Sequence, residues 1–125
     1  MVWAILADAV LALHAAFVAW AVFGALAVLR RPRAAWAHLP ALAWALWIEA
    51  TAGICPLTPL ESALLERAGQ AGIGASFLDH YLGALIYPAG LTPALQGALA
   101  LALALFNLGL YGLAAWRCLR RRRLR

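Results

Sequence analysis

Side chains that can carry acid–base, nucleophilic or metal-ligating chemistry gather in the middle of this 125-residue chain, between long apolar runs. The segment at residues 55–93 contains Cys55, Glu61, His80, Tyr81 and Tyr87. A cysteine beside a histidine and a carboxylate can act as an activated nucleophile, and the same groups can ligate a metal or haem. These side chains could therefore serve nucleophilic catalysis, metal or haem binding, or hydrogen bonding to a ligand.

Three further ionisable residues, Asp8, His14 and Glu49, lie inside apolar runs. An ionisable group within a membrane span costs about 2.5–3.5 kcal/mol on insertion scales, so it usually faces a partner or a water pocket. At a helical rise of about 1.5 Å per residue, Asp8 and Glu49 each lie roughly 7 Å inside the same side of the membrane. We therefore predict a polar pocket near that side, formed by Asp8, His14, Glu49, Cys55, Glu61, His80, Tyr81 and Tyr87.

Structural roles also explain these side chains: Asp8 can reach the interface, and His80 can bond to a backbone carbonyl. The sequence has no G-x-S-x-G, H-E-x-x-H or phosphate-cradling glycine motif, which argues against an enzyme. It also has no C-x-x-C or H-x-x-x-H spacing, so no metal or cofactor is predicted. Binding of a ligand or a partner subunit is the leading function. The alternatives are a membrane enzyme that uses a Cys, His and carboxylate site, and a haem or metal carrier.

The bulk composition predicts an integral membrane protein. With 66% hydrophobic and 12% charged residues, the chain has too little polar surface for a soluble domain of this length. The net charge of +5 is compatible with nucleic acid binding, but the basic residues follow apolar runs and form no basic face with interleaved aromatic residues. The predicted partners are the lipid bilayer and its anionic headgroups, with no nucleic acid.

Nine of the ten basic residues form two clusters, Arg30–Arg33 and Arg117–Arg125, and each cluster follows a long apolar run. Holding both clusters in the cytoplasm orients the chain. This predicts a single integral membrane domain over residues 1–125, with spans at residues 3–29, 36–54 and 94–116, an outer segment at residues 55–93, the N-terminus outside and the C-terminus in the cytoplasm. Cys55 and Cys118 then lie about 30 Å apart and cannot form a disulfide.

The outer segment carries start and stop signals for two short helices. Thr58-Pro59-Leu60-Glu61 is a capping-box pattern with proline at the first helical position, and Gly69 is placed to end that helix. A second helix follows over about residues 77–87, and Thr92-Pro93 begins the last span. The predicted fold is an all-α membrane protein with three transmembrane helices plus an outer-face hairpin of two short interfacial or re-entrant helices. If residues 73–90 cross the membrane instead, the fold is a four-helix transmembrane bundle.

Several short stretches in a fixed order carry a family resemblance. They are Ala7-Asp8 followed by His14, Arg31-Pro32 with Ala35-Trp36 and His38, Ile48-Glu49, the run from Cys55 to Glu61, His80-Tyr81, and Tyr87-Pro88-Ala89-Gly90-Leu91. Together they resemble the DUF2784 family of small bacterial membrane proteins, and the run from Cys55 to Glu61 is the most specific of them. The resemblance covers nearly the whole chain and implies a protein of the bacterial cytoplasmic (inner) membrane, with no particular activity.

Three spans alone bury little surface. Association with a second copy, or with a partner membrane subunit, through alanine- and glycine-lined helix faces is therefore also expected.

Overall fold

The computed structural model describes residues 1–72 and 92–125, which are mainly helical. The elements are α1 (Val2–Arg30), the 3-10 turn η1 (Pro32–Ala34), α2 (Ala35–Ala50), α3 (Leu57–Arg67) and α5 (Pro93–Arg123). Neither described part contains a strand. The predicted all-α fold class is confirmed.

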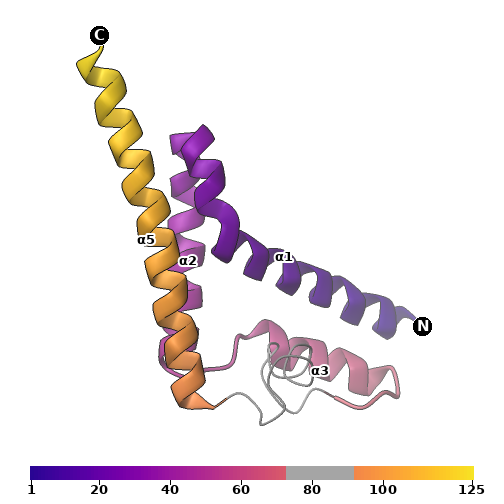
Figure 1. Ribbon diagram of the computed structural model, residues 1–125. Helices are drawn as coiled ribbons and strands as arrows, with labels where there is room; N and C mark the ends of the chain where they lie inside the picture. The colour runs from indigo at the N-terminus through magenta and orange to yellow at the C-terminus, as the bar shows by residue number, and fades with distance from the viewer. Residues whose placement is uncertain (73–91) are drawn as a thin grey trace.

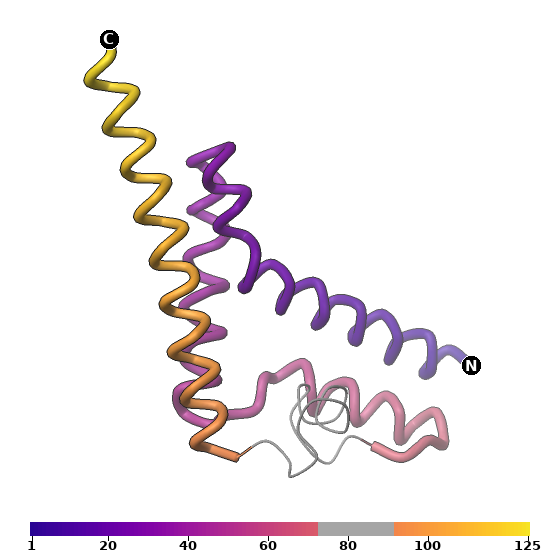
Figure 2. The backbone as a smooth tube through the Cα atoms, in the orientation of Figure 1, coloured from indigo at the N-terminus to yellow at the C-terminus, as the bar shows by residue number. Residues whose placement is uncertain are grey.

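The C-terminal part of α1 packs with α2 and α5 in a small bundle (Figure 1). The turn η1 leads from α1 into α2, and α2 runs back beside α5. The N-terminal part of α1 diverges from the bundle and lies over α3, which it contacts (Figure 2). The bundle therefore has one end near η1 and the C-terminus of the chain, and another end near α3.

Two of the described helices, α1 and α5, are long and apolar enough to cross a membrane. Their 29 and 31 residues correspond to roughly 43 and 46 Å of helix, against about 30 Å for a hydrocarbon core. The bounds of α1 lie within one residue of the predicted span at residues 3–29. By contrast, α5 continues past residue 116 to Arg123, because arginine is a good helix former and cations are favourable near a helix C-terminus.

The helix α2 ends at Ala50, four residues before the end predicted at residue 54. Its 16 residues give only about 24 Å of helix. The helix ends in a Schellman motif, in which Gly53 N donates to Ile48 O at 2.8 Å and Ala52 N donates to Glu49 O at 3.3 Å. Ala52 takes the left-handed conformation that the motif requires, with a φ of 50°. Glycine usually occupies this left-handed position. Because alanine occupies it here, the sequence does not mark the end of α2 at this residue.

The helix α3 begins earlier than the capping-box pattern predicts. Its first residue is Leu57, and Thr58 N donates to Cys55 O at 2.9 Å, so Thr58 lies inside the first turn. The Thr58 hydroxyl caps no backbone group in the described part of the chain. The reason is Pro56, whose φ of −56° is already helical and starts the helix upstream of Thr58.

Two other helix-end predictions are confirmed. Gly69 follows α3 with a φ of 77°, and this left-handed residue ends the helix. Thr92 caps α5, because its hydroxyl accepts a hydrogen bond from Leu95 N at 3.2 Å, and Pro93 is the first helical residue. The second short helix predicted at residues 77–87, and the choice between it and a fourth span, lie outside the described residues.

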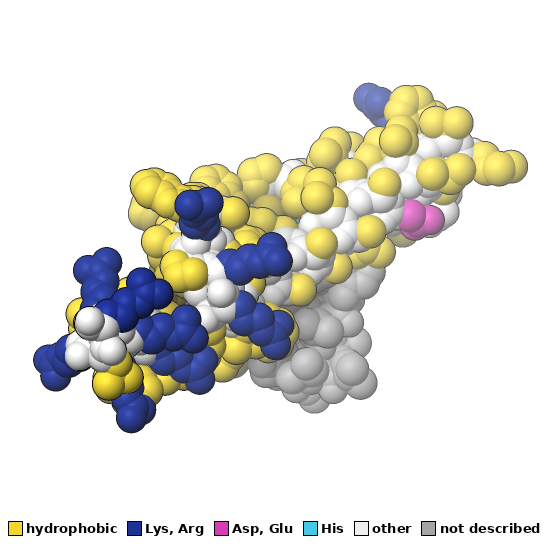
Figure 3. All heavy atoms as spheres, turned by 90° about the horizontal axis from the view of Figure 1, so that it is seen from above, with side chains coloured by type: hydrophobic (Ala, Val, Ile, Leu, Met, Phe, Trp, Pro, Cys, Tyr) yellow, Lys and Arg dark blue, Asp and Glu magenta, His cyan; other side chains and the backbone are white. Residues whose placement is uncertain are grey.

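Both arginine clusters lie at the η1 end of the bundle. Arg30 ends α1, Arg33 lies in η1, and Arg120 to Arg123 end α5. Figure 3 shows the basic side chains gathered at this end. At the other end of the molecule, the Arg67 guanidinium lies 5.0 Å from the centroid of the Trp3 ring, a cation–π contact that joins the end of α3 to the start of α1.

Candidate functional site

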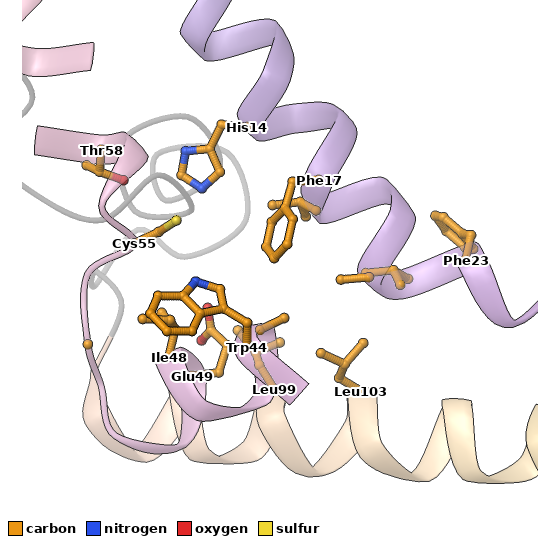
Figure 4. A pocket seen from close by; sticks show the side chains of 15 residues that line it. His14, Phe17, Phe23, Trp44, Ile48, Glu49, Cys55, Thr58, Leu99 and Leu103 are labelled. Carbon is orange, nitrogen blue, oxygen red and sulfur yellow. The ribbon is translucent and has the colours of Figure 1, made fainter. Parts of the chain in front are cut away.

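A cavity of about 390 Å³ lies at the α3 end of the bundle. It is bounded by α1, α2, α5 and the segment that leads from α2 into α3 (Figure 4). Small-molecule sites in proteins typically have volumes of about 300–1,000 Å³. The cavity is therefore large enough for a small ligand.

Most of the cavity wall is apolar. α1 supplies Phe17 and Phe23, α2 supplies Trp44, and α5 supplies Leu99 and Leu103. Figure 4 shows these side chains arranged around the space. Phe23 and Trp44 are 56% and 44% exposed, so parts of the cavity wall also lie at the surface of the bundle.

Polar side chains gather at one end of this cavity. His14 projects from α1, Thr58 from the first turn of α3, and Cys55 from the connecting segment (Figure 4). Glu49 reaches the same cavity from the last turn of α2. His14 and Thr58 are buried, whereas Cys55 and Glu49 are half-buried. The result is an apolar chamber with a small polar end.

Two oxygen atoms of this polar end have no hydrogen-bond partner in the described parts of the chain. Thr58 Oγ1 and Glu49 Oε2 are both buried, and neither is paired with any described residue. The Gln96 side chain of α5 lies beside the Glu49 carboxylate and interacts with it. A buried polar group without a partner costs about 1–3 kcal/mol, and native proteins contain few of them. Both side chains line the cavity, so these oxygens lie beside the space that a bound molecule would fill.

Glu61 lies behind the polar end and outside the cavity wall. It shares the buried face of α3 with Thr58 and Leu64, the face packed against α1. Its side chain is only 1% exposed and interacts electrostatically with His14. This interaction joins α1 to α3 and helps to hold the His14 ring at the polar end.

The structure brings together some of the side chains that the sequence assigned to a polar pocket. His14, Glu49 and Cys55 line the cavity, and Glu61 lies next to His14. Asp8 is exposed and does not line the cavity. The other three predicted members, His80, Tyr81 and Tyr87, lie outside the described residues. Within residues 1–72 and 92–125, no three His, Cys, Asp or Glu side chains gather as metal ligands. Cys55 and Cys118 are both free thiols.

Sequence reasoning missed Thr58, Trp44 and Gln96 as parts of the site. For Gln96 a signal exists in the sequence, because Gln96, Ala100 and Asn107 are spaced to share one face of α5 and are its buried residues. Small and polar residues within an apolar span usually face other helices. No comparable signal marks Trp44, because a tryptophan in a predicted span can equally well lie at the membrane–water interface.

A second polar cluster, missed entirely from the sequence, lies at the other end of the bundle. It comprises Trp20, Ala21 and Gly24 of α1, His38 of α2 and Tyr111 of α5, and we call it the His38 cluster. His38 is 0% exposed. Its Nε2 lies 3.2 Å from Ala21 O, and its Nδ1 lies 2.8 Å from the Tyr111 hydroxyl.

The hydrogen bonds of His38 fix its tautomer. A carbonyl oxygen only accepts, so Nε2 carries the hydrogen and donates to Ala21 O, and Nδ1 accepts from the Tyr111 hydroxyl. The Tyr111 ring stacks on the imidazole and the Trp20 ring meets it edge-on, both at a centroid distance of 5.7 Å. Every polar atom of this side chain is paired, so the cluster joins the three helices and leaves no position for a ligand.

The family model described as Protein of Unknown function (DUF2784) matches residues 4–112. The chain belongs to the DUF2784 family. The match contains the whole cavity wall and the whole His38 cluster, whereas the C-terminal arginines from Arg117 onward lie beyond it. No curated protein and no solved structure matches the chain.

Proposed function

We propose that this DUF2784 protein is an integral protein of the bacterial cytoplasmic membrane that binds a small amphiphilic molecule in the cavity. The cavity lies between helices of which two, α1 and α5, are long and apolar enough to cross a bilayer. Its apolar wall suits a hydrocarbon body, and its polar end suits a head group. In this proposal the cavity binds its ligand without a catalytic step.

The arginine clusters support an orientation with the η1 end in the cytoplasm. Arginine-rich segments next to spans are retained on the cytoplasmic side, and both clusters lie at that end of the bundle. The clusters then contact anionic headgroups of the inner leaflet. The cavity and α3, at the opposite end, face the outer leaflet.

Access from the bilayer supports a lipid-soluble ligand. Phe23 and Trp44 line the cavity and are also exposed on the outside of the bundle, where a membrane protein meets lipid. A molecule dissolved in the bilayer can therefore reach the cavity between α1 and α2 without crossing water.

The observation that carries this proposal is the pair of unpaired buried oxygens beside an apolar space. Thr58 Oγ1 and Glu49 Oε2 have no partner among the described residues, and both residues line the cavity. A head group bound there supplies the missing hydrogen bonds while the body of the ligand fills the space between Phe17 and Leu103.

A pair of substitutions on α2 tests the proposal. Ala45 lines the cavity, so Ala45→Phe fills part of it, whereas Ala43 is exposed and does not line it, so Ala43→Phe adds the same bulk outside. Each protein is extracted from its native membrane, and the small molecules that it retains are identified by mass spectrometry. We expect an amphiphile in stoichiometric amount with the wild type and Ala43→Phe, and its loss from Ala45→Phe. Equal retention by all three proteins, or no retained molecule in any, contradicts the proposal.

A further inference from the structure

We propose that the polar end of the cavity selects amphiphiles whose head group donates hydrogen bonds, with long-chain amines bound best and anionic head groups excluded. This inference rests on the proposed function and adds the chemical class of the ligand. It follows from the donors, acceptors and charges that surround Glu49 and Thr58.

The unpaired atoms at the polar end are oxygens. A carboxylate only accepts hydrogen bonds, and a hydroxyl both accepts and donates. The Glu49 Oε2 atom, which has no partner among the described residues, is the acceptor available to a ligand. Its complement is a donor, and an alkyl ammonium group carries three hydrogens where an alcohol carries one.

The charges around the cavity favour a cation over an anion. No Lys or Arg is found among the described residues that line it, and the charged side chain next to His14 is the acidic Glu61. In a medium of low dielectric constant, charge interactions are several times stronger than in water. An anionic head group therefore meets carboxylates with no Lys or Arg beside them in the described parts of the chain, whereas an ammonium group pairs with Glu49.

The head group also decides affinity because the bilayer competes for the body of the ligand. Lipid tails are as apolar as the cavity wall, so moving a hydrocarbon chain from the bilayer into the cavity gains little free energy. The hydrogen bonds and charge pairing at Glu49 and Thr58 are absent in the hydrocarbon core. They are the interactions that make binding in the cavity preferable to solution in the membrane.

Three probes with one chain and different head groups test this selectivity. ω-Bromoundecylamine, ω-bromoundecanol and ω-bromoundecanoate carry the same bromine, which quenches tryptophan fluorescence at short range. The protein is reconstituted in phosphatidylcholine nanodiscs, and the quenching that Trp44→Phe abolishes is assigned to the cavity, since Trp44 lines it. We expect affinities in the order amine, alcohol, carboxylate, with the amine and the carboxylate about 5- to 150-fold apart, the range for one buried hydrogen-bonding group.

Variants locate the selectivity at the polar end. Glu49→Gln should bring the affinities of amine and alcohol together, because it removes the carboxylate charge and keeps the size of the side chain. Thr58→Val should weaken both of these probes by removing the hydroxyl, and it keeps the inference testable if Glu49→Gln does not fold. Asp8→Asn is the matched control, since Asp8 is an exposed carboxylate on α1 that does not line the cavity. It should leave all three affinities unchanged.

The outcomes separate this inference from the proposed function. Saturable quenching with equal affinity for the three probes, or with the carboxylate bound best, overturns the head-group selectivity but leaves a ligand-binding cavity. Retention of the full amine preference in both Glu49→Gln and Thr58→Val also overturns it. If none of the probes quenches Trp44 in a saturable manner, the proposed function itself is contradicted.

Discussion

The same helices pack differently at the two ends of their bundle. At the η1 end, His38 is fully buried with both ring nitrogens hydrogen-bonded and its ring held between Trp20 and Tyr111. At the α3 end, a cavity remains, and Thr58 Oγ1 and Glu49 Oε2 have no partner in the described parts of the chain. Buried polar residues therefore do not by themselves mark a site. Within the described residues, polar atoms without a partner beside a cavity distinguish the α3 end, where we propose binding, from the η1 end, where every polar atom of His38 is paired.

The largest predicted difference between the two ends is in the free energy of unfolding after a polar side chain is removed. His38→Ala removes two hydrogen bonds and leaves a void, so we expect a loss of about 3 kcal/mol or more. Thr58→Val removes a hydroxyl that has no partner among the described residues, so it should change stability by less than about 1 kcal/mol. Denaturant titration followed by circular dichroism measures both.

Tyr111→Phe isolates one hydrogen bond of the His38 cluster. It deletes only the hydroxyl that donates to His38 Nδ1, and leaving this nitrogen unpaired should cost about 1–3 kcal/mol. If Thr58→Val lowered the free energy of unfolding as much as His38→Ala, the proposed difference between the η1 end and the α3 end of the bundle would be wrong.

The next prediction concerns the closeness of packing at the η1 end. A Cβ atom on Gly24 would overlap the His38 ring, whereas a Cβ atom on Gly109 of α5 meets nothing within 4 Å. Overpacking costs about 1–3 kcal/mol, which exceeds the gain of up to about 1 kcal/mol from replacing a helical glycine with alanine. Gly24→Ala should therefore lower the free energy of unfolding, and Gly109→Ala should raise it. A stabilising Gly24→Ala would show that α1 and α2 are not tightly packed at His38.

The smallest predicted effect lies at the rim of the cavity, where α2 ends. Ala52 has a left-handed φ of 50°, and this conformation costs a non-glycine residue roughly 1–2 kcal/mol. Ala52→Gly should therefore stabilise the protein slightly, by less than about 1 kcal/mol after the added backbone entropy of glycine is subtracted. Gly69→Ala, at the equivalent position after α3 with a φ of 77°, should destabilise it. A destabilising Ala52→Gly would contradict the assigned Schellman ending.

The helix ends show which parts of the fold are determined by the local sequence. Gly69 and Thr92 act on their own helices, through a left-handed φ and a side-chain cap, and both were predicted. The end of α2 was predicted four residues too late because Ala52 takes a conformation that its side chain does not signal. The start of α3 was missed because Pro56 and Thr58 are both acceptable start residues, and only the folded chain selects between them.

The sequence predicts those members of the candidate site that are ionisable, because placing an ionisable side chain in a membrane span costs free energy. His14 and Glu49 were identified because an ionisable group in an apolar run usually faces a partner or a pocket, and both line the cavity. Asp8, placed by the same argument, is exposed, because depth along a helix does not determine the face on which a residue lies. The His38 cluster depends on contacts among residues 20, 38 and 111, and no local spacing encodes a meeting of three distant segments.

The most direct test of the account measures whether the α3 end is completed by a ligand. Thermal unfolding of the wild type and of Ala45→Phe is followed in nanodiscs, with and without undecylamine and undecanol in turn. A ligand that binds only the folded state adds about 2.7 kcal/mol of stability at a hundred times its Kd. We predict that at least one of the two amphiphiles raises the Tm of the wild type and leaves that of Ala45→Phe unchanged. Equal shifts in both proteins would show that the amphiphile acts through the bilayer, and would contradict a binding site in the cavity.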